Sequence, residues 1–188
     1  RMLSLAGAVA AFLVTLPLWA GFDIANGGMQ FVELSRWIPR FNINYHLGVD
    51  GISMLFVVLN AFITIIVVAA GWEVIQTKVA QYNAAFLIMS GLMNGIFTSL
   101  DGVLFYVFFE ASLIPLYLII GVWGGPKRVY AAFKFFLYTL FGSLLFLLAL
   151  MYLFIQSGGS FSILEWHKLP IPLGSQIWLF LAFLIAFA

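Results

Sequence analysis

The stretch that decides the fold is VLFYVFFEASLIPLYLIIGV at residues 103–122, followed by the turn WGGPKR at residues 123–128. About 20 mostly apolar residues are the length that an α-helix needs to cross the hydrocarbon core of a bilayer. One carboxylate, Glu110, and one helix-disturbing residue, Pro115, lie inside this run. Glycines in the turn end one helix and Pro126 begins the next. The pattern therefore predicts two membrane-spanning helices joined by a tight turn.

Further apolar segments precede and follow this helix in the sequence, and the overall composition also indicates a membrane protein. Hydrophobic residues make up 64% of the 188 residues and charged residues 8%, with a mean hydropathy of +1.13. A soluble domain has roughly 45–50% apolar and about 25% charged residues, so a soluble fold is excluded. We predict an all-α integral membrane protein, a polytopic bundle of transmembrane helices over residues 2–20, 52–72, 82–100, 103–122, 129–155 and 176–188.

The two ends of the chain carry signals of their own. The first apolar segment has an alternative interpretation as a signal peptide cleaved after Ala20, although it is longer than the usual apolar region of such a peptide. The sequence begins with Arg1 rather than Met and ends at Ala188 inside an apolar run. We therefore expect an internal piece of a longer polypeptide.

Charge and residue counts exclude several classes of function. A formal net charge of +1 is too small for a nucleic-acid-binding surface. Without cysteine there can be no disulfide, iron–sulfur cluster or thiolate metal site within the chain. His46 and His167 are too few and too far apart to suggest haem or zinc. The sequence contains no phosphate-binding loop or catalytic triad, so we expect this chain to bind no cofactor or metal and to perform no covalent chemistry.

The connections predict how the helices are oriented. The long connection over residues 21–51 contains Trp37, Pro39 and Tyr45, which suits a segment lying at the membrane interface. Basic residues in alternate connections divide four against three, with Arg1, Lys78, Lys127 and Arg128 on one side and Arg36, Arg40 and Lys168 on the other. Because cytoplasmic loops are enriched in basic residues, this favours a cytoplasmic turn at residues 127–128.

Glu110 is the most informative residue. It lies about 10 Å from one end of the 103–122 helix, where a carboxylate costs roughly 2.5 kcal/mol or more and must face protein or water. Burial favours the protonated carboxyl, which predicts a proton relay; the alternative is a protonated acid that bonds a neighbouring helix. Pro115 frees the carbonyl of Ala111 and should kink the helix beside Glu110, and Tyr106 lies one turn earlier on the same face.

Lys134 is a second candidate in the 129–155 helix, and Tyr130 and Tyr138 share its face. Measured from the turn that joins the two helices, Lys134 lies about 7 Å deep and Glu110 about 18 Å deep. This offset argues against a direct ion pair but allows coupling through water. A lysine this near a helix end can also extend its ammonium group to the interface. The relay and this alternative both stay open.

Small and polar residues form stripes on the two preceding helices. Ser53, Asn60, Thr64 and Gly71 form one stripe, and Asn83, Ser90, Asn94 and Thr98 form the other. Residues 91–95 read GLMNG, a motif of two glycines four positions apart that is typical of close helix packing. These stripes predict helix–helix interfaces. Asp50 and Asp101 stand at the starts of predicted helices, where an N-cap is the plain explanation.

Longer stretches are specific enough to indicate a family. They are FYVFFEASLIPLYLIIGVWG at residues 105–124 and KFFLYTLFGS at residues 134–143, with WIPR at 37–40 and GVDGIS at 48–53 upstream. From about residue 36 to its end, the chain resembles the subunit M family of the proton-pumping NADH–quinone oxidoreductase, respiratory complex I. The mitochondrial counterpart is the fourth membrane subunit of NADH dehydrogenase.

The resemblance implies an antiporter-like fold of fourteen transmembrane helices, of which this chain would hold helices two to six and the start of seven. Residues 1–100 would then comprise the N-terminal helices and an interfacial loop, and residues 101–188 the beginning of the proton-translocating core. The resemblance also implies that Glu110 is essential for pumping and works with a lysine on a broken seventh helix, just past Ala188. It supports Glu110 much more strongly than Lys134.

The implied function is proton translocation coupled to NADH oxidation and quinone reduction in other subunits of the enzyme. Those subunits would hold the FMN and iron–sulfur clusters, and the related subunits L and N would be neighbours in the lipid bilayer. The location would be the bacterial inner membrane or, alternatively, the mitochondrial inner membrane. Two alternatives stand: a subunit of a multi-subunit cation/proton antiporter or membrane hydrogenase, and a passive scaffold in which Glu110 only joins helices.

Overall fold

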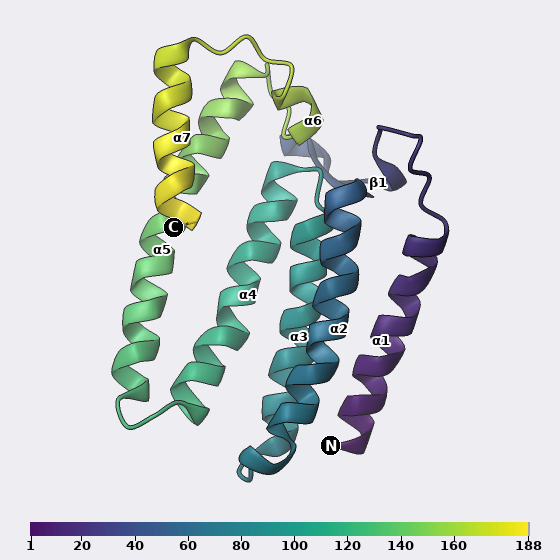
Figure 1. Cartoon of the computed structure of the whole chain (residues 1–188). Helices are drawn as coiled ribbons and strands as arrows, with labels where there is room; N and C mark the ends of the chain where they lie inside the picture. The colour runs from purple at the N-terminus through teal and green to yellow at the C-terminus, as the bar shows by residue number, and fades with distance from the viewer. Residues whose placement is uncertain (188) are drawn as a thin grey trace.

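The computed structural model describes residues 1–187, and these residues form a helical bundle (Figure 1). Five long helices lie side by side with alternating direction: α1 (Met2–Ala20), α2 (Gly51–Val74), α3 (Val79–Thr98), α4 (Gly102–Trp123) and α5 (Arg128–Gln156). A single turn, α6 (Ile163–Trp166), precedes α7 (Leu173–Phe187), which returns along α5. Each of the first four helices packs against the next one in the chain, and α5 packs against α7.

The helices confirm the membrane-bundle prediction. The largest difference from the expected starts is three residues, at Val79 and Leu173. Within residues 1–187, four helices are long and apolar enough to cross a membrane: α1, α2, α4 and α5. The 20-residue helix α3 is less apolar because its stripe contains Asn83 and Asn94, and α7 has 15 described residues.

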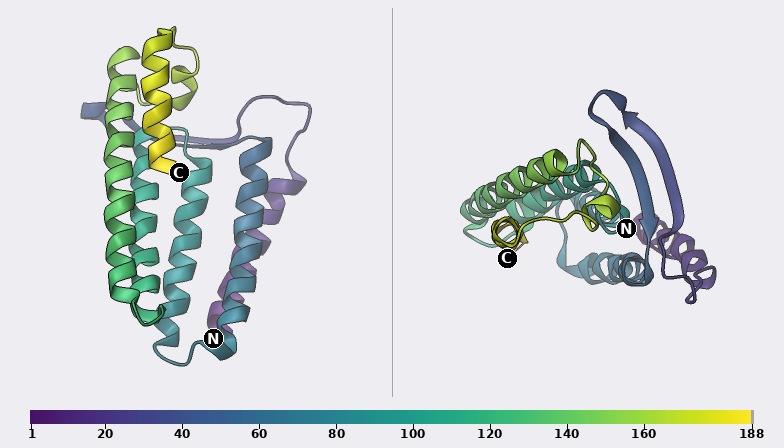
Figure 2. Two further views of the ribbon diagram at one scale, coloured as in Figure 1. Left: turned by 60° about the vertical axis from the view of Figure 1, so that its left-hand side comes forward. Right: turned by 90° about the horizontal axis from the view of Figure 1, so that it is seen from above.

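The connection between α1 and α2 forms a β-hairpin that the sequence analysis did not predict. Strand β1 (Gln30–Ile38) pairs antiparallel with β2 (Ile43–Val49), and the 3-10 turn η1 (Pro39–Phe41) joins them. Figure 2 shows the hairpin lying across the helix axes at one end of the bundle. The interfacial segment expected over residues 21–51 is therefore an ordered ribbon.

The two ends of the bundle differ in how they are built. The N-terminus and the α2–α3 and α4–α5 turns lie at one end, while the hairpin and α6 lie at the other (Figure 1). At the first end, the indole Nε1 of Trp123 donates to the Thr77 carbonyl at 2.9 Å, and the Arg1 guanidinium donates to the Ile75 carbonyl at 2.8 Å. The connections alternate between the two ends as the charge analysis assumed.

Helices α2 and α3 are joined by polar side chains inside the apolar region. Asn60 Nδ2 donates to the Ser90 carbonyl at 2.9 Å and to Asn94 Oδ1 at 2.7 Å, and the Thr64 hydroxyl donates to Ser90 Oγ at 2.8 Å. Each bond crosses from one helix to the other, so these groups do not face lipid without a partner. The two polar stripes form the predicted interface.

Candidate functional site around Glu110

Helix α4 positions Glu110, and its first turn is fixed by Asp101. As predicted, Asp101 is the N-cap: its Oδ1 accepts from the backbone N–H of Val103 at 3.0 Å and of Leu104 at 3.2 Å. These bonds satisfy two of the N–H groups that a helix start leaves unpaired. Glu110 follows a little more than two turns later, inside the membrane-spanning part of the helix.

The carboxyl group of Glu110 has a buried oxygen, Oε1, without a hydrogen-bond partner among the described residues. Most buried polar atoms in proteins are hydrogen-bonded, and one that is not requires an explanation such as a functional role or a bound water. The alternative to a relay, a hydrogen bond from this oxygen to a neighbouring helix, is not made within residues 1–187.

A polar group close to the Glu110 carboxyl belongs to Tyr106, which in turn lies beside Ser143 on α5. The Tyr106 hydroxyl lies in the electrostatic range of the Glu110 carboxyl group and faces the Ser143 side chain. Ser143 is fully buried, and its hydroxyl donates to the Leu140 carbonyl at 3.0 Å. Because the Ser143 proton is used in that bond, its oxygen can accept a hydrogen bond from Tyr106. Two hydroxyl groups thus extend the polar site from Glu110 across to α5.

Pro115 is buried one turn after Glu110, and α4 continues through it. Proline lacks the N–H that would bond the Ala111 carbonyl, so this acceptor remains next to Glu110 in the chain. The neighbouring Ser112 hydroxyl donates instead to the Phe109 carbonyl at 2.7 Å. The helix therefore lacks one backbone hydrogen bond at Ala111, the residue that follows Glu110.

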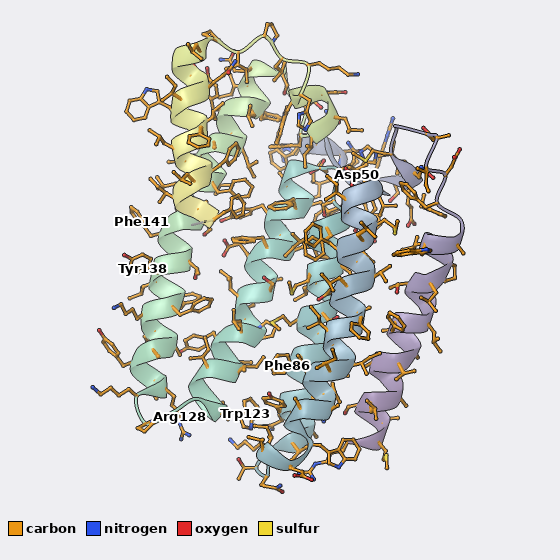
Figure 3. All side chains as sticks on the ribbon, viewed as in Figure 1. Asp50, Phe86, Trp123, Arg128, Tyr138 and Phe141 are labelled. Atoms are coloured by element: carbon orange, nitrogen blue, oxygen red, sulfur yellow. The ribbon has the colours of Figure 1, made fainter. Side chains whose placement is uncertain are left out.

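Lys134 and Tyr138 lie on the opposite side of α5 from this site. Lys134 is exposed, Tyr138 is 78% exposed, and Phe141 beside them is 64% exposed. Figure 3 shows Tyr138 and Phe141 on the outer side of α5, directed away from α4. The structure thus brings Tyr106 and Pro115 together with Glu110 but does not bring Lys134 or Tyr138 there.

Aromatic rings and helix α7 close the other side of the site. Phe109 lies edge-on to Phe187 of α7, with ring centroids 5.4 Å apart, and Phe105 packs in the same way on Phe146 of α5 at 5.6 Å. Gly142, next to Ser143, lets α7 approach so closely that an added Cβ would lie 3.1 Å from the Cα of Ala186. Such apolar packing excludes water and strengthens the electrostatic interactions of any charge in the site.

Within residues 1–187, no group of three or more His, Asp or Glu side chains is arranged to hold a metal ion. What the sequence analysis missed is the second role of Asp101. Besides capping α4, its Oδ2 accepts from the backbone N–H of Asn44 in β2 at 3.0 Å. No sequence signal linked residues 44 and 101, because the hairpin itself was not predicted.

Comparison with known proteins identifies the family of this chain. Residues 99–188 match the family described as NADH:quinone oxidoreductase/Mrp antiporter, transmembrane. Over its whole length, the chain is 48% identical to NADH-quinone oxidoreductase subunit M of Rhodobacter capsulatus and 44% identical to NADH-ubiquinone oxidoreductase chain 4 of Arabidopsis thaliana. The chain belongs to this family. It spans about 38% of the length of these two relatives.

Solved structures of the NADH:quinone oxidoreductase/Mrp antiporter family have the same fold. A chain of respiratory complex I from Thermus thermophilus with bound NADH matches 99% of this chain and 38% of its own length, with a TM-score of 0.85 and 33% identity. A chain of the Mrp complex from Dietzia sp. DQ12-45-1b matches 97% of this chain and 20% of its own length, with a TM-score of 0.85 and 18% identity. The second match shows the fold alone.

Proposed function

We propose that this chain is part of a proton-translocating membrane-arm subunit of NADH–quinone oxidoreductase, with Glu110 as the group that takes up and releases the proton. The observation that carries the proposal is the buried Oε1 of Glu110 without a hydrogen-bond partner. A carboxyl group kept as glue would bond a neighbouring helix through this atom. An unpaired acceptor inside a spanning helix is instead suited to bind a proton or a transient water.

Electrostatics can drive the uptake and release. A nearby positive charge favours the ionised carboxylate, and its withdrawal in an apolar site favours proton binding. The resemblance places the lysine that would supply this charge beyond Ala188, outside the described residues. Helix α7, which would lead to it, packs beside Ser143 at Gly142. Tyr106 lies close to Glu110 and beside Ser143, so we assign these two residues to the path of the proton.

In this proposal the chain moves protons and carries out no redox step. NADH oxidation and quinone reduction, with FMN and iron–sulfur clusters, belong to other subunits, and the absence of cysteine in this chain is consistent with that division. The neighbours would be the related subunits L and N. The bacterial relatives favour the bacterial inner membrane, and the Arabidopsis relative favours its mitochondrial counterpart.

The test compares Glu110→Gln with the wild type in the full-length protein, assembled in its complex. NADH-driven proton uptake into inverted membrane vesicles should fall about tenfold or more, because glutamine has no titratable group but nearly the same shape. Glu165→Gln, an exposed change outside the spanning helices, serves as the matched control and should leave uptake unchanged.

Assembly of the complex is checked in the same membranes. An assembled Glu110→Gln enzyme that pumps normally would refute the carrier role and return Glu110 to a structural one. If NADH drove no proton uptake in the wild type, while the protein exchanged cations for protons, the antiporter alternative would replace the proposal.

A further inference from the structure

The carboxylate of Asp101 joins two parts of the molecule that are far apart in the sequence. Its Oδ1 accepts from the first turn of α4 at Val103 and Leu104, and its Oδ2 accepts from the backbone N–H of Asn44 in β2. Both oxygens are therefore used, each on a different element. The residue is 2% exposed, so little water competes for these bonds.

Backbone hydrogen bonds on both sides of Asp101 extend this junction. The N–H of Leu100 donates to the His46 carbonyl of β2 at 2.8 Å. The N–H of Gly102 donates to the Phe161 carbonyl at 2.8 Å, and the N–H of Ile163, at the start of α6, donates to the Leu100 carbonyl at 2.9 Å. These backbone bonds join the hairpin, the α3–α4 junction and α6 to one another. The buried Asp101 side chain takes part in the same junction.

Capping alone does not explain why a carboxylate stands here. Asp50 caps α2 with one oxygen, which accepts from Ile52 and Ser53, and it is more exposed than Asp101. A serine or asparagine side chain would cap a helix equally well without a buried charge. What distinguishes Asp101 is the second acceptor that it presents to Asn44. That acceptor fastens the hairpin to the start of α4.

We propose that Asp101 is a positioning residue that transmits displacements of the β-hairpin to α4, and thereby to Glu110. The inference rests on the proposed role of Glu110 as proton carrier. Glu110 follows Asp101 by nine residues, or about 14 Å along the helix. A continuous helix moves largely as one element over that distance, so a shift of its first turn moves Glu110 and Tyr106 together relative to Ser143 on α5.

Asparagine separates the two roles of Asp101. An amide has one carbonyl oxygen and an NH₂ group that cannot accept a hydrogen bond, so it can serve α4 or Asn44 but not both. We expect Asp101→Asn to assemble and oxidise NADH while the number of protons moved per electron falls about twofold or more. Asp50→Asn changes a cap whose carboxylate bonds only the first turn of α2, at Ile52 and Ser53, and it should leave the ratio unchanged.

A disulfide can replace the lost fastening without restoring the charge. Leu47 of β2 and Ser99 form an isolated antiparallel bridge next to Asp101, and directly opposed residues of antiparallel strands lie within the Cα separation that a disulfide spans. Residues 1–188 contain no cysteine, so Leu47→Cys and Ser99→Cys have only each other as partners within this stretch. In the Asp101→Asn background, oxidation should restore the proton-to-electron ratio and reduction should lower it again.

Hydrogen exchange provides a readout that does not depend on pumping. The amide of Asn44 should exchange faster in Asp101→Asn than in the wild type, and oxidation of the cysteine pair should slow it. If the amide exchanges faster but the ratio stays normal, or if the disulfide closes without restoring the ratio, the hairpin does not act through Asp101 and the proposal is overturned. If Glu110→Gln also pumps normally in the same preparation, the carrier role itself has failed.

Discussion

At the scale of single residues, α4 holds two carboxyl groups in contrasting surroundings. The Asp101 carboxylate accepts hydrogen bonds from three backbone N–H groups. One buried oxygen of Glu110, in contrast, has no hydrogen-bond partner among the described residues. Bonds to charged groups contribute about 1.5–3 kcal/mol each, and an unpaired buried polar atom costs about 1–3 kcal/mol. The hydrogen bonds of Asp101 therefore offset part of the cost of burying its charge, whereas the unpaired oxygen of Glu110 carries a cost that the proposed proton-carrier role would explain.

The two capping aspartates should respond to pH in opposite directions. Hydrogen bonds from the backbone, first of all from Ser53, lower the pKa of Asp50 below its usual value of 3.8, and burial raises the pKa of Asp101 above that value. The stabilisation from Asp50 is complete above the usual pKa and is lost as pH falls through the lowered one. The stabilisation from Asp101 is complete below the usual pKa and is lost as pH rises through the raised one.

Thermal unfolding in detergent, followed by circular dichroism from about pH 3 to 6, tests this contrast. The stability advantage of wild type over Asp50→Asn should shrink toward acid pH, and the advantage over Asp101→Asn should shrink toward neutral pH. Parallel curves for the two variants would contradict both assignments.

At the scale of elements, only one glycine of the predicted pair at residues 91–95 is a packing contact. A Cβ on Gly95 would lie 2.7 Å from the ring of Phe108 on α4, whereas a Cβ on Gly91 would meet nothing within 4 Å. The motif thus correctly indicated close helix packing, but its partner helix and the unequal roles of its glycines depend on tertiary geometry. Gly95 determines how closely α3 approaches α4.

We expect Gly95→Ala to destabilise the bundle by about 1–3 kcal/mol, because the Phe108 ring and the two helices must move apart. Gly91→Ala is the matched control, and it should be neutral or stabilise α3 by up to about 1 kcal/mol through helix propensity. Unfolding by denaturant in mixed micelles measures both variants. Equal effects at the two positions would show that Phe108 does not limit the approach of α3.

At the scale of the whole molecule, apolar run length was sufficient to locate the long helices α1 to α5 and α7, since a bilayer permits few alternatives to a helix, but it did not indicate the single turn α6. The hairpin was missed because residues 30–49 show no clean alternation: nearly all of β1 is exposed, so neither face is marked by a hydrophobic pattern. Glu110 could be identified because a mid-membrane carboxylate is costly. The sequence could not reveal the Tyr106–Ser143 contact or the Asp101–Asn44 bond, because each joins positions that are distant in the sequence.

The orientation of the helices in the membrane is a prediction. Because residues 1–188 contain no cysteine, single introduced cysteines can test it. Gly27 lies in the connection before the hairpin and Gly125 in the α4–α5 turn, and a side chain added at either would have open space. Four basic residues against three favour a cytoplasmic α4–α5 turn.

A membrane-impermeant maleimide should therefore label Gly125→Cys in inverted vesicles and Gly27→Cys in right-side-out vesicles. The reverse pattern would invert the orientation. Labelling of both positions from one side would contradict the alternation of the spanning helices.

The polar contacts between α2 and α3 also bear on how the chain enters the membrane during synthesis. Helix α3 is too polar to be among the four helices that can cross a bilayer on their own hydropathy, and asparagine is unfavourable when it faces lipid alone. Asn60 of α2 provides the partner that Asn94 needs, and a short turn at residues 75–78 keeps the two helices together. We therefore expect α2 and α3 to enter the bilayer as a pair, with Asn60 of the earlier helix satisfying Asn94 of the later one.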